Sequence, residues 1–122
     1  MLPNVHVILI IESDQPTADM YRRELSREYC VLTSTDTPTI FEILQTQSLS
    51  AIVLEPALQG GQGWHLFSEI QQVNSWKSIP VILCTTLDER QRGIDLGAAA
   101  YLVKPTLPST LRDTLRHVIH KS

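Results

Sequence analysis

The chain has 122 residues, of which 43% are hydrophobic and 19% are charged, and its formal net charge at pH 7 is −3. This length and composition predict one globular domain over 1–122 with a full hydrophobic core. Lysine and arginine are scattered rather than gathered into a stripe, and no apolar run approaches the ~20 residues of a membrane span, so we expect neither nucleic-acid binding by this domain nor membrane insertion.

Five short apolar runs predict β-strands. They cover residues 5–11, 29–33, 51–54, 80–84 and 100–103. The first, third and fourth are almost continuously aliphatic or β-branched, which is typical of strands buried on both faces of a parallel sheet.

Helices are predicted between the strands and after the last one. Pro16, Pro38 and Pro108 lie where the first turns of the first, second and fifth helices would begin, a position that proline favours. Apolar residues with helical spacing continue each of these patterns. The stretch 88–96 is mostly polar and contains Gly93, so we expect a short, mobile fourth helix.

Strands that alternate with helices predict an α/β fold of the doubly wound, flavodoxin-like (βα)5 kind. Right-handed crossovers favour a five-stranded parallel sheet in the order 2-1-3-4-5. Such sheets gather their chemistry at the carboxyl ends of the strands. The polar residues that follow four of the strands are Glu12, Ser13 and Asp14, then Glu55, then Thr85 and Thr86, then Lys104 with Pro105.

Carboxylates and a lysine at one sheet edge suit metal-assisted phosphoryl transfer. Carboxylate oxygens hold Mg²⁺, and a lysine adds positive charge opposite them. Glu12 and Glu55 as merely solvated carboxylates are the alternative, which the matching Lys104 disfavours. Asp14 is better explained as the residue that starts the first helix than as a metal ligand.

These residues resemble the receiver domains of two-component response regulators, the CheY-like family, and the match spans the whole chain. Residues 8–14 are similar to the family's apolar strand with its acidic pair. Glu55 stands at the phosphoacceptor position, eight residues before Gly63, which opens the third helix. Residues 80–86 resemble the strand that ends in the switch hydroxyl, and residues 96–105 are similar to the family's most recognisable stretch.

The resemblance implies a role for each residue at this edge. It assigns metal binding to Glu12 and Ser13, with Asp14 beside them, and phosphate acceptance to Glu55. It also implies a cis peptide bond between Lys104 and Pro105. The switch residues would be Thr85 and Tyr101, and the charge-neutralising residue would be Lys104.

Two positions depart from the family pattern. Glu55 replaces an aspartate, and its extra methylene moves the carboxylate about 1.5 Å further out. A misplacement of ~1 Å can slow a reaction ~100-fold. Ser13 replaces a carboxylate that would touch the metal. We therefore expect a degenerate phosphorylation site, a pseudo-receiver, with at most weak Mg²⁺ binding.

The leading hypothesis is a signalling domain that works without phosphate. Glu55 would pair with Lys104, accept a hydrogen bond from Thr85, and so partly imitate the activated state. Partners would be a histidine kinase or an output domain or protein, with a homodimer as a further option, bound by the face of the fourth helix, fifth strand and fifth helix. That face would include Arg90, Tyr101, Arg112 and Arg116.

Two other functions stay open. The first is a working receiver that takes phosphate on Glu55 or elsewhere in a phosphorelay. The second is a flavodoxin-like cofactor-binding module, which the acids after the first strand disfavour because they would repel a flavin phosphate. No nucleophile and base stand out as a pair, so we expect no enzyme. The two cysteines, Cys30 and Cys84, and the lack of a basic, apolar leader favour a cytoplasmic setting.

Overall fold

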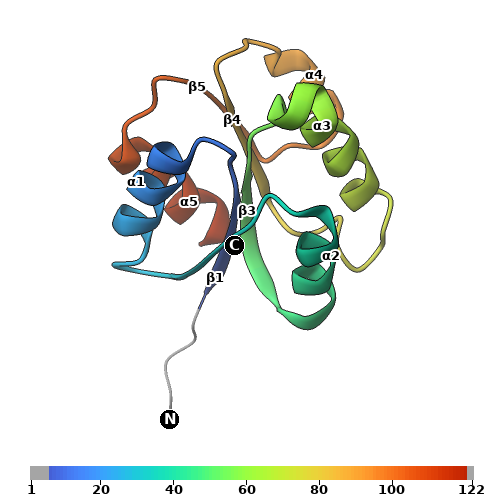
Figure 1. Cartoon of the computed structure of the whole chain (residues 1–122), viewed down its shortest axis with the longest axis horizontal. Coiled ribbons are helices and arrows are strands. Elements are labelled where there is room, and N and C mark those ends of the chain that lie inside the picture. Colours follow the sequence, from blue (N-terminus) through green and yellow to red (C-terminus); the bar gives the residue numbers. More distant parts are fainter. Residues whose placement is uncertain (1–5, 121–122) are drawn as a thin grey trace.

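The structure, a computed structural model that describes residues 6–120, is a parallel sheet with helices on both faces (Figure 1). The strands are β1 (Val7–Ile11), β2 (Cys30–Thr33), β3 (Leu49–Leu54), β4 (Val81–Thr85) and β5 (Ala100–Val103). They pair in parallel in the order β2-β1-β3-β4-β5. The predicted fold class and strand order are therefore confirmed.

The helices connect consecutive strands and follow the last one. They are α1 (Gln15–Leu25), α2 (Thr37–Thr46), α3 (Leu58–Gln71), α4 (Arg90–Asp95) and α5 (Pro108–Ile119). In Figure 1, α1 and α5 lie on one side of the sheet, and α2 and α3 lie on the other, with α4 above α3. The fourth helix has only six residues, so its predicted shortness is confirmed.

Several strand ends differ from the predicted ones by one or two residues. The second strand begins at Cys30 rather than at 29, and the fourth runs to Thr85. The third begins at Leu49, two residues early, because Leu49 pairs with Val7 across an irregularity in the register. The predicted start of the first strand at residue 5 lies outside the described residues.

Each face of the sheet buries its own apolar cluster because successive side chains of a strand point to opposite faces. In β1, Leu9 and Ile11 join the cluster under α2 and α3, whereas Ile8 and Ile10 join the cluster under α1 and α5. All four are fully buried, and burial of one such side chain contributes roughly 1.5–3 kcal/mol. The helical partners include Phe67 and Ile70 on the first side and Tyr21, Leu25, Leu111 and Leu115 on the second.

Aspartates begin the first two helices. The Asp14 carboxylate accepts a hydrogen bond from Thr17 N at 3.1 Å, and the Asp36 carboxylate accepts one from Thr39 N at 3.0 Å. Hydrogen bonds from the threonine side chains and backbone lower the pKa of both aspartates. The hypothesis that Asp14 starts the first helix is therefore confirmed.

The loop after β3 reverses direction through a left-handed turn before α3 continues. Gln59, Gly60 and Gly61 have φ values of 48°, 71° and 101°. Glycine adopts such angles at little steric cost, which explains the glycine pair at this point. Gly63 then packs so closely on the chain that a Cβ atom there would lie 2.4 Å from Glu55 O.

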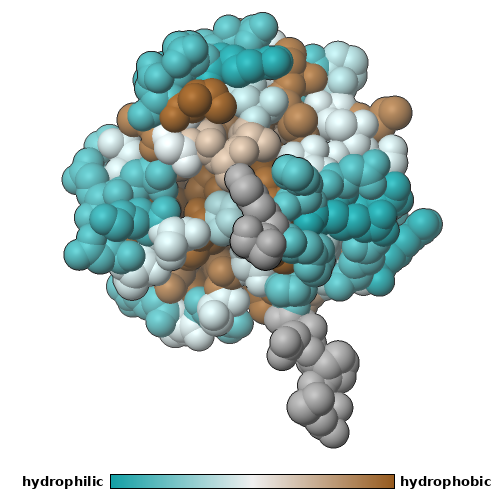
Figure 2. All heavy atoms as spheres, turned by 180° about the vertical axis from the view of Figure 1, so that it is seen from behind, coloured by the Kyte–Doolittle hydropathy of each residue, from teal (hydrophilic) through white to brown (hydrophobic). Residues whose placement is uncertain are grey.

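Hydrophilic side chains cover most of the face seen from behind, with apolar side chains showing in the recesses between them (Figure 2). Large apolar residues that are exposed in the described chain are Leu87, Ile94 and Leu107. Among residues 6–120, no helix has the length and apolar character needed to cross a membrane.

Candidate functional site

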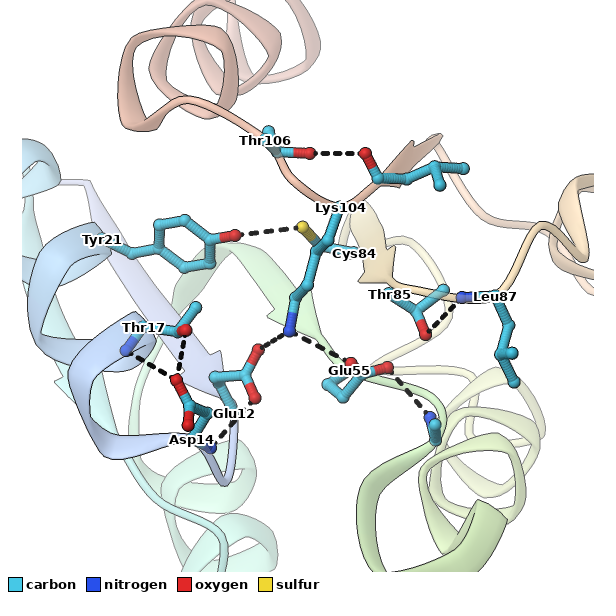
Figure 3. Close-up of polar contacts among 12 residues, drawn as sticks. Glu12, Asp14, Thr17, Tyr21, Glu55, Cys84, Thr85, Leu87, Lys104 and Thr106 are labelled. Atoms are coloured by element: carbon cyan, nitrogen blue, oxygen red, sulfur yellow. Dashed lines mark hydrogen bonds and ion pairs between the residues drawn. The ribbon is translucent and has the colours of Figure 1, made fainter.

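A buried cluster of two carboxylates and one ammonium lies at the carboxyl edge of the sheet (Figure 3). Glu12 follows β1, Glu55 follows β3, and Lys104 follows β5. Lys104 Nζ lies 3.1 Å from Glu55 Oε1 and also donates to Glu12 Oε1. We call these three residues the carboxylate cluster. The predicted pairing of Glu55 with Lys104 is confirmed.

The remaining oxygen of each glutamate is bound by the backbone. Glu12 Oε2 accepts a hydrogen bond from Asp14 N at 3.1 Å. Glu55 Oε2 accepts one from Ala57 N at 3.1 Å. Each glutamate is 8% exposed. All four carboxylate oxygens of the cluster thus have a donor within the protein, as buried charged groups require.

The electrostatics of the cluster keep Lys104 charged. Burial lowers the pKa of Lys104, but hydrogen bonds and charge attraction from Glu12 and Glu55 outweigh it, so that the pKa lies above its ordinary value. Two carboxylates and one ammonium leave a formal charge of −1. Lys104 is therefore a fixed internal cation at physiological pH.

The residues at this edge do not fit a magnesium site. Ser13 and Asp14, expected beside the metal, are both exposed, and the Asp14 carboxylate caps α1. Asp14 Oδ2 accepts hydrogen bonds from Thr17 N and Thr17 Oγ1, so this carboxylate is engaged at the start of the helix. Mg²⁺ demands near-octahedral oxygen ligands, and the oxygens of Glu12 and Glu55 already have donors. Across residues 6–120, no group of three or more His, Cys, Asp or Glu is arranged to hold a metal ion.

The predicted hydrogen bond between Thr85 and Glu55 is wrong. Thr85 is fully buried, and its Oγ1 accepts a hydrogen bond from Leu87 N at 3.4 Å. No hydrogen bond joins Thr85 to Glu55 in the described chain, where the donors to the Glu55 oxygens are Lys104 Nζ and Ala57 N. Figure 3 shows Thr85 turned toward Leu87.

Tyr101 lies close to Thr85 in the hydrogen-bond network although it comes from the next strand. Its ring is 8% exposed, and its hydroxyl donates to Leu87 O at 2.5 Å and accepts from Glu89 N at 2.9 Å. Burial raises the pKa of Tyr101. Leu87 therefore bonds to Thr85 through its N–H and to Tyr101 through its carbonyl. We call Thr85, Leu87, Glu89 and Tyr101 the switch region.

Two arginines expected on the face of α4, β5 and α5 turn toward α1 instead. Arg112 Nη1 lies 2.6 Å from Glu24 Oε2, and Arg116 Nε lies 3.0 Å from Glu28 Oε2. Arg112 and Arg116 are four residues apart and lie on one stripe of α5, whereas Glu24 lies in α1 and Glu28 lies in the turn after it. Of the expected arginines, Arg90 stays beside Tyr101, with its guanidinium carbon 6.0 Å from the ring centre.

One further prediction concerns the loop after β5. The Lys104–Pro105 peptide bond is cis, as the resemblance implied. In α3, Trp64 is 6% exposed and packs in the core. The Arg92 guanidinium carbon lies 4.1 Å from the centre of the Trp64 ring, a cation–π contact between α4 and α3.

Sequence reasoning missed the backbone groups that complete the site. The N–H groups of Asp14, Ala57, Leu87 and Glu89 are donors that no residue type encodes. Their positions follow from the loop conformations, which only the structure supplies. The stacking of Arg92 on Trp64 was missed as well, since these residues are 28 positions apart in the sequence.

This fold, with its acids, hydroxyl and lysine at one edge, defines a signalling domain of the receiver type. The chain belongs to the response regulator receiver domain family, whose model matches residues 8–116.

Several curated relatives are named as regulators of transcription. The transcriptional regulatory protein HprR of Escherichia coli K12 is 33% identical over 80% of this chain and 44% of its own length. The probable transcriptional regulatory protein SilR of Salmonella typhimurium is 28% identical over 93% of this chain and 51% of its own length. The chain thus spans about half the length of the curated relatives it matches.

Solved structures share the fold. The N-terminal receiver domain of a Bacteroides fragilis response regulator has a TM-score of 0.89 at 21% identity and covers 98% of this chain and 100% of its own. CheY4 of Vibrio cholerae has a TM-score of 0.84 at 24% identity, covering 94% and 99%. The receiver domain of the sensor histidine kinase PA1611 of Pseudomonas aeruginosa, with a magnesium ion in its active-site cleft, has a TM-score of 0.78 at 23% identity, covering 95% and 98%.

Proposed function

We propose that this receiver domain signals without being phosphorylated, through contacts with other proteins. The observation that carries the proposal is that the carboxylates of the cluster are hydrogen-bonded within the protein. Every oxygen of Glu12 and Glu55 has a protein donor, and Lys104 supplies the positive charge between them.

The chemistry of phosphoryl transfer explains why this arrangement disfavours it. A carboxylate oxygen must attack the phosphorus atom in line, and a cation must neutralise the phosphoryl oxygens. Attack by either Glu55 oxygen would start from an oxygen that is already held by a hydrogen bond from Lys104 or Ala57, which restricts its approach to the phosphorus atom. The missing carboxylate at Ser13 removes a metal ligand from the same edge. Both steps of the usual reaction are therefore disfavoured by the same set of side chains.

The proposed output is protein binding by the face of α4, β5 and α5. Leu87 and Ile94 expose apolar side chains near this face, and Arg90 supplies a positive charge. The partner would be a histidine kinase, an output domain or protein, or a second copy of the chain. The domain would act in the cytoplasm, without catalysis and without binding nucleic acid itself.

A working phosphoacceptor is the second candidate, and one contact favours it. Lys104 lies 3.1 Å from Glu55, so a positive charge stands beside the acceptor position as phosphorylation requires. The same contact supports both functions, so only a chemical test separates them.

The test is an incubation with acetyl phosphate or phosphoramidate and Mg²⁺, followed by intact-mass measurement. We expect the wild-type protein to gain no adduct of about 80 Da, the mass of a phosphoryl group. The matched control is the double variant Ser13→Asp, Glu55→Asp, which places an aspartate at both positions that depart from the family pattern. This variant should gain the adduct. A stable adduct on the wild type that disappears in Glu55→Gln would overturn the proposal.

A further inference from the structure

A glycine lies in the middle of α4, where no turn requires it. Gly93 is helical, unlike Gly60, Gly61 and Gly97, which have positive φ values. Glycine is the least favourable residue in a helix interior after proline, because it loses the most backbone freedom. In a helix of six residues this choice weakens an already short element. Something other than the backbone conformation must explain Gly93.

The space around Gly93 is filled by the Tyr101 ring. A Cβ atom at residue 93 would lie 2.7 Å from Tyr101 Cδ2 and 3.2 Å from Tyr101 Cε2. It would also lie 2.9 Å from Leu83 Cδ1, in a side chain that is fully buried in β4. These distances are shorter than van der Waals contact, so any side chain at residue 93 would displace the ring or the helix.

The far end of the ring is held by the backbone on the same side. The Tyr101 hydroxyl is bound to Leu87 O and Glu89 N. Glu89 O in turn accepts the hydrogen bond of Gly93 N at 3.1 Å, which starts α4. Glu89 thus links the hydroxyl of Tyr101 to the first turn of the helix that lies on its ring. The ring cannot withdraw from residue 93 without breaking these hydrogen bonds.

We propose that Gly93 is a positioning residue: because it has no side chain, the Tyr101 ring can occupy its buried site under α4. The missing side chain allows α4 to lie directly on the ring, so that α4 and Tyr101 adopt a single joint arrangement. The inference rests on the proposed function, in which partners bind the face of α4, β5 and α5, because Tyr101 of β5 packs directly under α4 at that face. It adds the residue that sets the position of Tyr101 by packing, independently of the carboxylate cluster.

A double-mutant cycle tests this inference, because the change in Tm caused by Gly93→Ala should have opposite signs with and without the Tyr101 ring. Gly93→Ala should lower the Tm of the wild-type protein, because the new methyl group meets the Tyr101 ring. In a Tyr101→Ala background the same substitution should raise the Tm by a few degrees. The ring is gone, the end of the Leu83 side chain can move into the space that the ring leaves, and alanine favours the helix. Folding of the double variant where Gly93→Ala alone fails to fold would support the inference equally.

The matched control is Gln91→Ala, an exposed position in the same helix. Its effect on the Tm should be the same in both backgrounds, because Gln91 pairs with Asp95 rather than with Tyr101. Shifts for Gly93→Ala that are equal in the two backgrounds would overturn the inference.

Two spectroscopic readouts report the arrangement directly. In the wild type, nuclear Overhauser effects should connect the Gly93 α-protons with the Tyr101 ring protons, and their absence would overturn the inference. With Trp76→Phe leaving Trp64 as the single tryptophan, Gly93→Ala should shift the Trp64 emission, because Arg92 rests on that ring. An unchanged emission would count against displacement of α4.

The outcomes for Gly93 and for phosphorylation are separable. A wild-type protein that takes phosphate while the sign reversal persists would overturn the proposed function and leave the role of Gly93 intact. A wild-type protein that gains no phosphoryl group but shows additive effects in the double-mutant cycle would leave the proposed function intact and overturn the role of Gly93.

Discussion

The carboxylate cluster and the switch region lie side by side at one edge of the sheet but are held together differently. The cluster is joined by charged hydrogen bonds between the side chains of Glu12, Glu55 and Lys104. The switch region is joined through the backbone of the loop after β4. No described hydrogen bond connects Glu55 with Thr85 or Tyr101. One backbone hydrogen bond, from Lys104 N to Thr85 O at 2.8 Å, does join the two regions. We therefore expect the arrangement of the switch region to depend on its own hydrogen bonds more than on the Glu55 side chain.

This difference predicts where each region is sensitive. Removing one partner from a buried ion pair leaves an uncompensated charge, which is among the costliest single changes in a protein. Removing a charge from Glu55 while keeping its shape should disturb the cluster but leave the switch region as it is. Variants of the cluster and of its neighbours can break or sharpen this comparison.

The largest effect is expected for Lys104→Met. The substitution keeps an unbranched side chain that lacks only the terminal ammonium, and it leaves the buried carboxylates of Glu12 and Glu55 without a cation between them. We expect a loss of about 3 kcal/mol in the free energy of unfolding at pH 7, measured by urea denaturation. The matched control is Lys77→Met, at an exposed lysine, which should change stability by less than about 0.5 kcal/mol.

The pH dependence of this loss follows from the charges involved. The raised pKa of Lys104 means that its contribution is present below the ordinary lysine value of about 10.4 and is lost as pH rises through the native value. The difference between variant and wild type should therefore shrink as the pH rises from 7 to 11. A difference that stays constant over this range would contradict this account of the cluster.

The sequence predicted most of the fold because the relevant signals are local. Continuous apolar runs marked β1, β3 and β4, and the alternation with helices restricted the strand order. The start of β3 was missed because Ser48 and Ser50 interrupt its apolar pattern. Cap residues such as Asp14 were recognised because an aspartate before a proline is a local signal of a helix start.

The candidate site was predictable in its side chains but not in its connections. Glu12, Glu55 and Lys104 meet as expected, because parallel strands bring their ends together. The hydrogen-bond partner of Thr85 was not predictable, since it depends on the conformation of the loop that brings Leu87 N close to Thr85 Oγ1. The glycine in the fourth helix was visible in the sequence, but its reason, the ring of Tyr101, lies in the next strand.

A smaller effect is expected for metal binding. The wild-type protein should show no saturable Mg²⁺ binding below about 1 mM in a calorimetric titration, because Lys104 and the backbone bind the available oxygens. Ser13→Asp should strengthen binding about tenfold or more by adding a charged ligand at this edge. Ser13→Asn, which is similar in shape but neutral, is the matched control. Tight wild-type binding would show that the cluster opens readily.

The most direct measurement is a comparison of backbone amide NMR spectra of the wild type and Glu55→Gln. The amides of Asp14, Ala57 and Lys104 should shift, because they belong to or bind the carboxylate cluster. The amides of Leu87, Glu89 and Tyr101 should keep their wild-type positions, because the switch region has no hydrogen bond to Glu55. Shifts at Leu87, Glu89 and Tyr101 as large as those at Ala57 would contradict the claim that the acid does not control the switch region.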